Sequence, residues 1–250
     1  MIRRIDVNCD IGETSLPWQQ SHEPALMRLI TSANVACGGH AGDEWSMREV
    51  CREAHRVGIR IGAQVSYPDR ERFGRVVMEI DSGSLAESLN EQFEALVRAA
   101  AAESTCVSYV KPHGALYNVV VTREDHARVV VDLAARHGVG LFGLDGSMTH
   151  HLARRAGVPF VREWFADRGY MNSGQLAPRS RGDALVTSNT AIRDRVVQLI
   201  RHGTVQTVEG GEISVEFDTI CVHSDTPGAV SLLDEVRRAL TEFDIAVGAS

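Results

Sequence analysis

The amino-acid sequence predicts an α/β protein whose core is a seven-stranded (β/α) barrel with one active-site mouth. Two observations lead to this fold class. Apolar, β-branched runs alternate with amphipathic helical patterns along the chain, and polar residues recur where the apolar runs end. Strands that alternate with helices of this length form a parallel sheet covered by helices. Polar residues at one end of seven such strands favour a closed or nearly closed barrel, because ligands sit at the carboxyl ends of parallel strands.

Seven segments are expected to form the strands, and five amphipathic segments with apolar residues at helical spacing are expected to form helices. Ser84 is expected to cap one helix and Gly58 to end another. Two short runs around Gly210 and Gly211 predict a small inserted β-hairpin near residues 204–216. The strand segments are 5–9, 32–39, 58–67, 107–112, 139–144, 158–165 and 219–224, and the helical ones are 44–58, 84–103, 126–138, 189–203 and 228–243.

The composition limits the classes of function. The chain has 250 residues, 44% of them hydrophobic, and no linker, low-complexity stretch or repeat divides it, so we predict a single domain over residues 1–250. A formal net charge of -7 without a basic stripe argues against a nucleic-acid partner. No apolar run approaches the ~18 residues that cross a membrane. The start, MIRRIDVNCD, has no apolar signal core, so we expect a cytoplasmic protein.

The five cysteines give no sign of a disulfide framework or a structural zinc site, because their number is odd and no C-x-x-C pair occurs. Free cysteines usually pack as small buried hydrophobes. We therefore expect all five to belong to the core: Cys9, Cys37, Cys51, Cys106 and Cys221.

Polar, chemically able residues follow five of the predicted strands. Each is weak evidence alone, because a strand-end histidine is often structural and an Asp-x-x-Glu is often a turn or cap. Three histidines at strand ends, two of them near an aspartate, favour a functional site over separate structural roles. The candidates are Asn8, Asp10, Glu13, Asn34, His40, Asp43, Lys111, His113, Tyr117, Asn118, Glu163, Asp167, Arg168, His223 and Asp225. The remaining histidines are expected at the surface, His150 and His151 on a further predicted helix with charged neighbours: His22, His55, His126, His137, His150, His151 and His202.

Two long polar loops are further candidates, over residues 68–83 and 166–182. Both carry several arginines, which suit carboxylate or phosphate recognition, although Arg70, Arg72 and Arg181 are equally explained as solvated surface. The sequence contains neither the phosphate loop G-x-x-x-x-G-K-[ST] nor the nucleophile elbow G-x-S-x-G.

Lys111 is the only lysine, so the other 25 of the 26 positive side chains are arginines. Lysine is a compact point charge whose pKa falls when it is desolvated, whereas arginine keeps its proton. Lys111 lies between an apolar strand and His113. This position indicates a role that needs a small cation or a neutral amine.

Five motifs in order along the chain resemble the LamB/YcsF family, whose members are described as the A subunit of 5-oxoprolinase. They are NCDIGE, ANVACGGHAGD, VKPHGALYN, FADRGY with the later APRS, and DTICVH. The resemblance implies a seven-stranded (β/α) barrel related to glycoside hydrolases and polysaccharide deacetylases. The chain departs from the family pattern at Gln64, where a histidine is common, at Gly39 and at Ser224. We expect the catalytic set not to depend on Gln64.

The family implies an ATP-dependent opening of 5-oxoproline to L-glutamate, together with subunits B and C. ATP would be a cosubstrate bound by this chain or by its partners, and whether a metal takes part is unknown. An arginine, Arg168 or Arg179, is expected to hold the substrate carboxylate. The expected catalytic residues are Asp10, Glu13, His40, Asp43, Lys111 and His113, and the expected substrate-binding residues are Asn8, Asn34, Tyr117, Asp167, Arg168, Arg179, His223 and Asp225.

Two alternatives remain open. In a metal-dependent hydrolase of the deacetylase type, Asp10, His40 and His113 would hold a divalent metal that activates water. In a non-catalytic binding protein, the same cluster would capture a small acid and present it to partners. Metal analysis separates the first from the lactam-opening hypothesis, and a His113→Ala variant that loses binding would favour the second.

Overall fold

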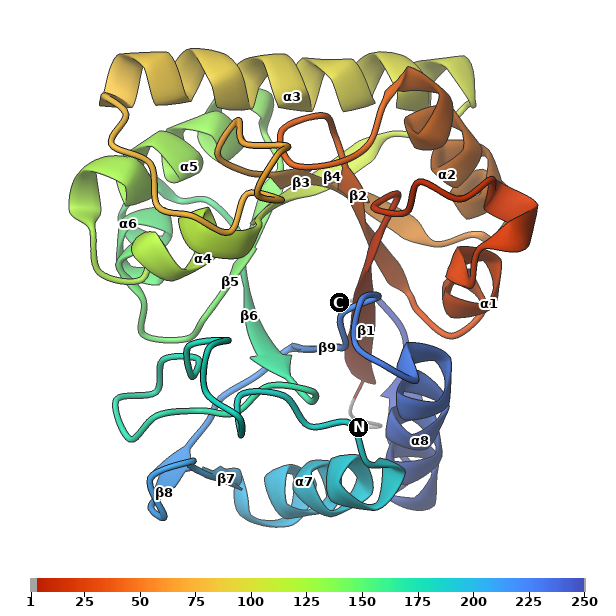
Figure 1. Cartoon of the computed structure of the whole chain (residues 1–250), viewed down its shortest axis with the longest axis vertical. Coiled ribbons are helices and arrows are strands. Elements are labelled where there is room, and N and C mark those ends of the chain that lie inside the picture. The colour runs from red at the N-terminus through yellow and green to blue at the C-terminus, as the bar shows by residue number, and fades with distance from the viewer. Residues whose placement is uncertain (1–3, 250) are drawn as a thin grey trace.

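Seven parallel strands close into a barrel within residues 4–249, which the computed structural model describes (Figure 1). Each strand pairs with the next around the ring, and β9 pairs with both β6 and β1, which closes it. The strands are β1 (Arg4–Ile11), β2 (Ser32–Ala36), β3 (Arg60–Val65), β4 (Val107–Pro112), β5 (Gly140–Gly143), β6 (Phe160–Phe165) and β9 (Thr219–Cys221). Six of them lie within the predicted segments, and β1 extends beyond the predicted residues 5–9 at both ends. The predicted fold class is confirmed.

Helices surround the barrel and separate most consecutive strands (Figure 1). The longer ones bury one face, as in α2, where Met47, Val50 and Cys51 are buried. The helices are α1 (Glu23–Met27), α2 (Glu44–Val57), α3 (Ser82–Ala102), α4 (Gly114–Val119), α5 (Glu124–His137), α6 (Met148–Ala156), α7 (Asn189–His202) and α8 (Ala229–Glu242), with a 3-10 turn η1 (Trp18–Gln20). The short α1 and α4 escaped prediction because each is too brief to show a periodic apolar pattern.

Capping residues set the ends of the helices. One predicted cap is present and another differs from the prediction. Gly58 ends α2 in the left-handed conformation, with φ of 73°, as its sequence position suggests. The serine cap predicted for α3 is wrong. The Asp81 side chain accepts hydrogen bonds from the backbone N–H groups of Gly83 and Ser84, so the helix begins earlier, at Ser82.

The predicted hairpin is present as β7 (Thr204–Gln206) and β8 (Glu212–Ser214), which pair antiparallel. A short strand that the sequence did not suggest, β10 (Ala246–Val247), pairs with the start of β1. No helix within residues 4–249 combines the length and the apolar character needed to span a bilayer.

The apolar core lies between the strands and the helices. Alternate residues of β1, such as Val7 and Cys9, are buried there and belong to the main hydrophobic cluster. Four of the five cysteines are buried as expected, whereas Cys106 is exposed in the turn before β4, which corrects the prediction for that residue. The other set of β1 residues points into the barrel, and that interior is polar.

Candidate functional site

The barrel interior carries hydrogen-bonded polar side chains in layers. At the lower end, Asp6 accepts hydrogen bonds from the hydroxyls of Ser32 and Thr219. One layer above, Asn34 Nδ2 donates to Asn8 Oδ1 at 2.8 Å and to Asp10 Oδ1 at 2.9 Å. All of these side chains are buried. Because side chains alternate between the two faces of a strand, the spacing Asp6, Asn8, Asp10 places three polar groups of β1 inside the barrel.

Lys111 lies at the top of this column, at the end of β4. Its Nζ donates to Asp10 Oδ1 at 2.8 Å, lies 3.2 Å from Glu163 Oε1 and contacts Cys221 Sγ at 3.4 Å. The Lys111 side chain is 3% exposed, so water screens none of these contacts. Strands β1, β4, β6 and β9 each supply one member of the cluster.

The Lys111 ammonium is the charged form. Burial lowers its pKa, but Asp10, Cys221 and Glu163 outweigh burial and raise it well above the usual value for lysine. Burial likewise raises the pKa of Asp10, and Lys111 and His223 reverse the shift and hold it well below its usual range. Of the two tasks that the sequence left open for Lys111, the structure favours the small cation over the neutral amine.

Tyr117 leaves a polar atom for a ligand. Neither carboxylate oxygen of Glu163 nor the Tyr117 hydroxyl makes a hydrogen bond with well-formed geometry to the described residues. Burial, then the nearby Glu163, raises the pKa of Tyr117 well above its usual value, so the phenol keeps its proton. Glu163 is paired with Lys111, whereas Tyr117 borders the adjoining cavity, where a polar ligand would supply the hydrogen bond that its hydroxyl lacks.

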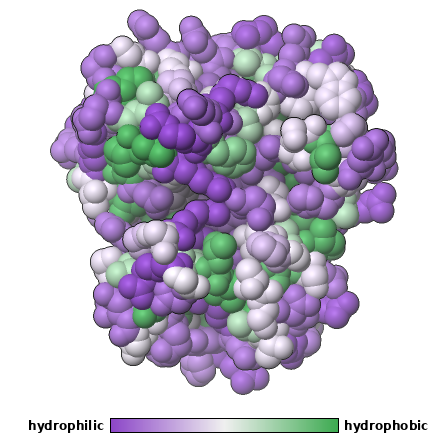
Figure 2. Space-filling view, in the orientation of Figure 1, coloured by the Kyte–Doolittle hydropathy of each residue, from purple (hydrophilic) through white to green (hydrophobic). Residues whose placement is uncertain are grey.

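A cavity of about 430 Å³ opens at this end of the barrel. Hydrophilic side chains gather around the centre of the same face (Figure 2). Asp10, Lys111 and Tyr117 are among its walls, and Arg75 and Arg179 enter from the two long loops. Both arginines pair with Asp225, with Arg179 Nη1 at 3.3 Å from its Oδ2. The volume lies in the range of small-molecule sites, and the arginines suit an anionic group.

An aspartate–histidine pair borders the same cavity. His223 Nδ1 lies 3.0 Å from Asp167 Oδ2, and the His223 backbone N–H donates to the same oxygen. Thr226 Oγ1 donates to it as well, at 2.6 Å. His223 and Thr226 outweigh burial and lower the pKa of Asp167, which remains a carboxylate. A histidine held in this way through Nδ1 has its other ring nitrogen available for proton transfer.

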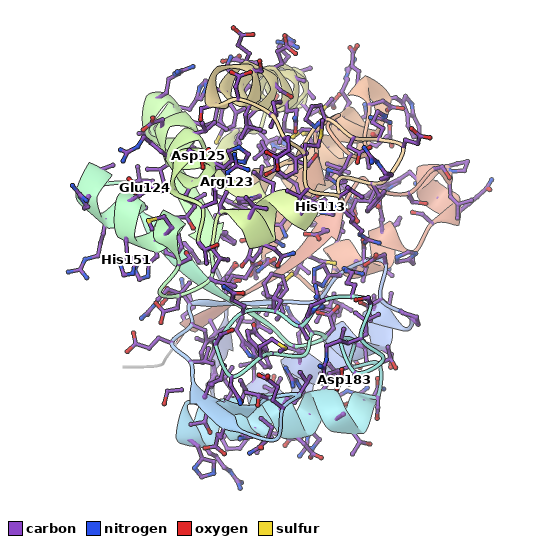
Figure 3. All side chains as sticks on the ribbon, turned by 60° about the vertical axis from the view of Figure 1, so that its left-hand side comes forward. His113, Arg123, Glu124, Asp125, His151 and Asp183 are labelled. Carbon is purple, nitrogen blue, oxygen red and sulfur yellow. The ribbon has the colours of Figure 1, made fainter. Side chains whose placement is uncertain are left out.

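A second cluster joins Glu13, His40 and His113. Glu13 Oε1 lies 3.1 Å from His40 Nε2 and 3.4 Å from His113 Nδ1, and the two imidazoles stack at 3.7 Å between ring centroids. Gln64 Nε2 is 2.9 Å from both Glu13 Oε1 and His113 Nδ1. Figure 3 places His113 toward the centre of the molecule, unlike His151 on the outside of α6. Burial and His40 lower the pKa of His113 well below its usual value, so that ring is neutral.

Several expectations need correction. Among residues 4–249, the one group of possible metal ligands that converges is Glu13, His40 and His113. The set of Asp10 with both histidines is therefore wrong, because Asp10 is held by Lys111 and Asn34. The expectation that the catalytic set does not depend on Gln64 stays a prediction, and the structure places Gln64 in contact with two of its members.

Asp43 borders a second cavity, which Glu13 and His40 also line. Its side chain accepts from the Ser46 backbone N–H and caps α2, at an exposed position. Asn8 lies one layer below the mouth, bonded to Thr219. Arg168 is buried, and its guanidinium donates to the carbonyls of Ala177 and Ala184, so it holds the loop as well as lining the cavity.

Among the histidines expected at the surface, His126 is fully buried and hydrogen-bonded between the Tyr67 hydroxyl and the Ile80 carbonyl. The sequence predicted that Cys221 is a core residue but did not predict its contact with Lys111. It also did not identify Arg75 as a residue that lines the cavity. Alternation along β1 and β6 was the available signal for the polar interior, since Asp6, Asn8, Asp10 and Glu163 all interrupt buried strands at inward positions.

The fold and site define a (β/α)-barrel protein with a charged mouth. The barrel fold, without the site, is also found in a carbohydrate esterase. A family 4 carbohydrate esterase from Streptomyces lividans superposes with a TM-score of 0.51 at 11% identity, covering 98% of this chain and 92% of that one. At that identity the likeness concerns the fold alone.

The model of the LamB/YcsF family matches residues 5–250, and the chain belongs to this family. It is 46% identical to the 5-oxoprolinase A subunit of Streptomyces avermitilis, over 98% of this chain and 99% of that protein. It is 44% identical to the 5-oxoprolinase A subunit of Streptomyces coelicolor, again over 98% and 99%. The crystal structure of a lactam utilization protein from Thermus thermophilus superposes with a TM-score of 0.90 at 33% identity, covering 99% of this chain and 100% of that one.

Proposed function

We propose that this chain opens the ring of 5-oxoproline as the A subunit of an ATP-dependent 5-oxoprolinase and yields L-glutamate together with subunits B and C. The names of its relatives support the lactam and an assembly of several subunits. The observation that carries the proposal is the buried, charged Lys111 at the wall of a cavity that arginines also enter.

The reaction adds water across the lactam C–N bond. The γ-phosphoryl group of ATP first bonds to the lactam oxygen, and ADP leaves. The water oxygen then bonds to the activated ring carbon, the C–N bond breaks, and the nitrogen takes up protons as the free amine. The acyl phosphate that remains is hydrolysed by a second water to carboxylate and phosphate. Negative charge is carried by the phosphorylated lactam oxygen during these steps. The Lys111 ammonium supplies a preorganised positive charge for that oxygen in a site from which bulk water is excluded.

His223 is the best-placed proton acceptor for the attacking water. Asp167 holds its Nδ1 and stabilises the imidazolium that forms, which leaves Nε2 to take the proton. Asp10 is less suited to this task, because Lys111 and Asn34 occupy its Oδ1 and its pKa is depressed. Arg75 and Arg179 are proposed to hold the substrate carboxylate or a phosphoryl group.

ATP is the cosubstrate, because a five-membered lactam resists opening and needs coupling to a favourable reaction. The sequence has no Walker phosphate loop. We therefore place the ATP-consuming step in the assembly with subunits B and C rather than in this chain alone.

The test measures glutamate release from 5-oxoproline and ATP, first by the isolated chain and then with subunits B and C. Turnover by the mixture alone is the expected result, and turnover by the isolated chain would refute the placement of the ATP step. In the mixture, Lys111→Arg is expected to lose most activity, because guanidinium is larger and differently shaped. Full activity of that variant, or no glutamate from any mixture, would overturn the proposal.

A further inference from the structure

The guanidinium of Arg168 is a buried charge in the wall of the main cavity. The residue is 4% exposed, follows the end of β6 and lines the same cavity as Lys111. Within residues 4–249 it forms no ion pair, and its two hydrogen bonds go to neutral carbonyl groups, those of Ala177 and Ala184. A buried charge without a counter-ion is costly, so this wall is suited to an anionic ligand.

The adjacent carboxylate does not pair with Arg168. Asp167 Oδ2 accepts hydrogen bonds from the Thr226 hydroxyl and the His223 backbone N–H, and His223 Nδ1 lies 3.0 Å from it. Burial lowers the pKa of Arg168, the like charge of Arg179 lowers it further, and Asp167 offsets only part of this shift. The guanidinium still keeps its proton, because arginine is not deprotonated in proteins.

Two further arginines line the same cavity. Arg75 comes from the loop between β3 and α3, and Arg179 comes from the loop between β6 and α7, which also carries Arg168. Arg75 and Arg179 share one carboxylate, that of Asp225. The three guanidinium groups of this wall thus have a single carboxylate partner, which leaves two positive charges without an ion-pair partner among the described residues.

The loop holds Arg168 in place before any ligand binds. Arg195 of α7 donates hydrogen bonds to the backbone carbonyls of Ala166 and Arg168, at 3.1 and 2.6 Å. Nε and Nη2 of Arg168 donate to two carbonyls of its own loop, whereas Nη1 makes no hydrogen bond with a described residue. The guanidinium is therefore fixed in the cavity wall with one nitrogen available to a ligand.

We propose that Arg168, together with Arg75 and Arg179, binds a phosphoryl group that enters the cavity on a lactam already phosphorylated on its carbonyl oxygen. A phosphoryl group carries about two negative charges at neutral pH and three acceptor oxygens. These numbers match the two unpaired charges and the three guanidinium groups. A carboxylate has a single charge and would leave one guanidinium unmatched, although arginine suits both anions.

The identity of this ligand rests on the proposed function, in which ATP phosphorylates the lactam within the assembly. Lys111 borders the same cavity and is proposed to stabilise the oxygen to which the phosphoryl group is attached. The chain would then take the activated lactam from its partner subunits rather than bind the free lactam first. Binding of a phosphoryl anion does not require the reaction, so the test is made without lactam.

The test titrates the purified full chain with inorganic phosphate by calorimetry at constant ionic strength. We expect one phosphate per chain, bound at least about tenfold more tightly than acetate, because its second charge pairs with a second guanidinium. Arg168→Gln should weaken phosphate binding by about 10- to 100-fold, the range for losing a hydrogen bond to a charged group. Arg181→Gln is the matched control, because Arg181 lies in the same loop but is exposed and paired with Asp183.

Two further measurements guard against a loop that is merely disrupted, because Arg168 also holds its own loop. Circular dichroism checks the fold of each variant, and Arg179→Gln, at a position whose side chain is 30% exposed, should also weaken phosphate binding. Crystals of the native chain soaked in tungstate, a tetrahedral dianion like phosphate, should show an anomalous peak beside Arg168 Nη1.

The outcomes separate the subsite from the reaction. Absence of phosphate binding, equal affinity for phosphate and acetate, equal affinity in Arg168→Gln and Arg181→Gln, or a tungstate peak elsewhere would each overturn the subsite and leave the ring-opening reaction untouched. Displacement of bound phosphate by Mg-ATP would assign the subsite to the nucleotide and overturn the lactam as the carrier. Phosphate binding without glutamate release from the assembled subunits would support the subsite and count against the reaction.

Discussion

The ion pairs at the mouth of the barrel are buried, whereas those on the helical shell, the outer surface of the surrounding helices, are exposed to water. Lys111 meets Asp10 and Glu163 where all three side chains are at most 3% exposed. On the shell, Arg52 bridges Glu49 and Glu103 with 53% of its side chain exposed. Water solvates the shell charges whether or not they pair, whereas a mouth charge that loses its partner has no solvent to replace it. The burial of an ion pair, and not the number of ion pairs, therefore decides how much the loss of one partner reduces the stability of the protein.

The largest expected effect comes from removing the central charge of the mouth. Lys111→Met leaves Asp10 and Glu163 buried without a cation, and breaking such a pair costs about 3–5 kcal/mol. Denaturant unfolding of the purified chain measures this loss. The matched control adds Asp10→Asn and Glu163→Gln to Lys111→Met and should regain much of the stability, since no charge remains unpaired. A single variant as stable as the native chain would show that the mouth charges are solvated.

The next effect is on the proposed chemistry. Asp167→Asn removes the negative charge that orients His223, so turnover in the assembled enzyme should fall by about 10²–10⁴-fold, the range for losing general acid–base catalysis. Asp183→Asn, in the same loop but exposed and paired with Arg181, is the control. Equal activity of the two variants would remove His223 from the mechanism.

A smaller effect is expected at the rim of the mouth. Burial raises the pKa of Asp225, but Arg179 and Arg75 outweigh it and hold that pKa below its usual value. A carboxyl with a depressed pKa in the folded state adds stability above its unfolded pKa of about 3.9 and loses it as the pH falls through the folded value. Asp225→Asn should therefore lower the free energy of unfolding at pH 7, and the difference should shrink below about pH 4. A difference that grows in acid would contradict the assignment.

The smallest effect belongs to the shell. Arg52→Ala removes ion pairs that water already screens, so the shift in melting temperature should be smaller than that of Asp225→Asn and should vanish in high salt. Thermal unfolding at low and high salt measures both points. A larger shift than that of the rim variant would mean that the shell pairs form a cooperative network.

The sequence predicted the strands, the long helices and the hairpin because their signals are local and repeat along the chain. It also predicted that Asp10, Lys111, His113 and His223 would gather, since strand ends meet at one end of a barrel. The LamB/YcsF membership suggested by the five motifs is confirmed by the family match. The single domain and the cytoplasmic location stay predictions.

The sequence could not predict which side chains contact each other in the site. Asp10 and Glu13 are three residues apart, yet one pairs with Lys111 and the other with two histidines, because β1 ends between them. Asp43 was expected at the site from its motif, and its motif did not show that it also caps α2. Gln64 departs from the family pattern, and the sequence did not predict that it contacts both Glu13 and His113. Such outcomes depend on neighbours that are distant along the chain.

The polar column inside the barrel also determines how the ring can close. Asp6 and Asn8 of β1 lie in register with Thr219 and Cys221 of β9, and Thr219 bonds to both β1 side chains. A slip of one residue between these strands would turn Asp6, Asn8 and Asp10 outward against the apolar helices. The polar groups of the interior thus also disfavour a one-residue slip between the first and last strands, so they help to select the register in which the ring closes.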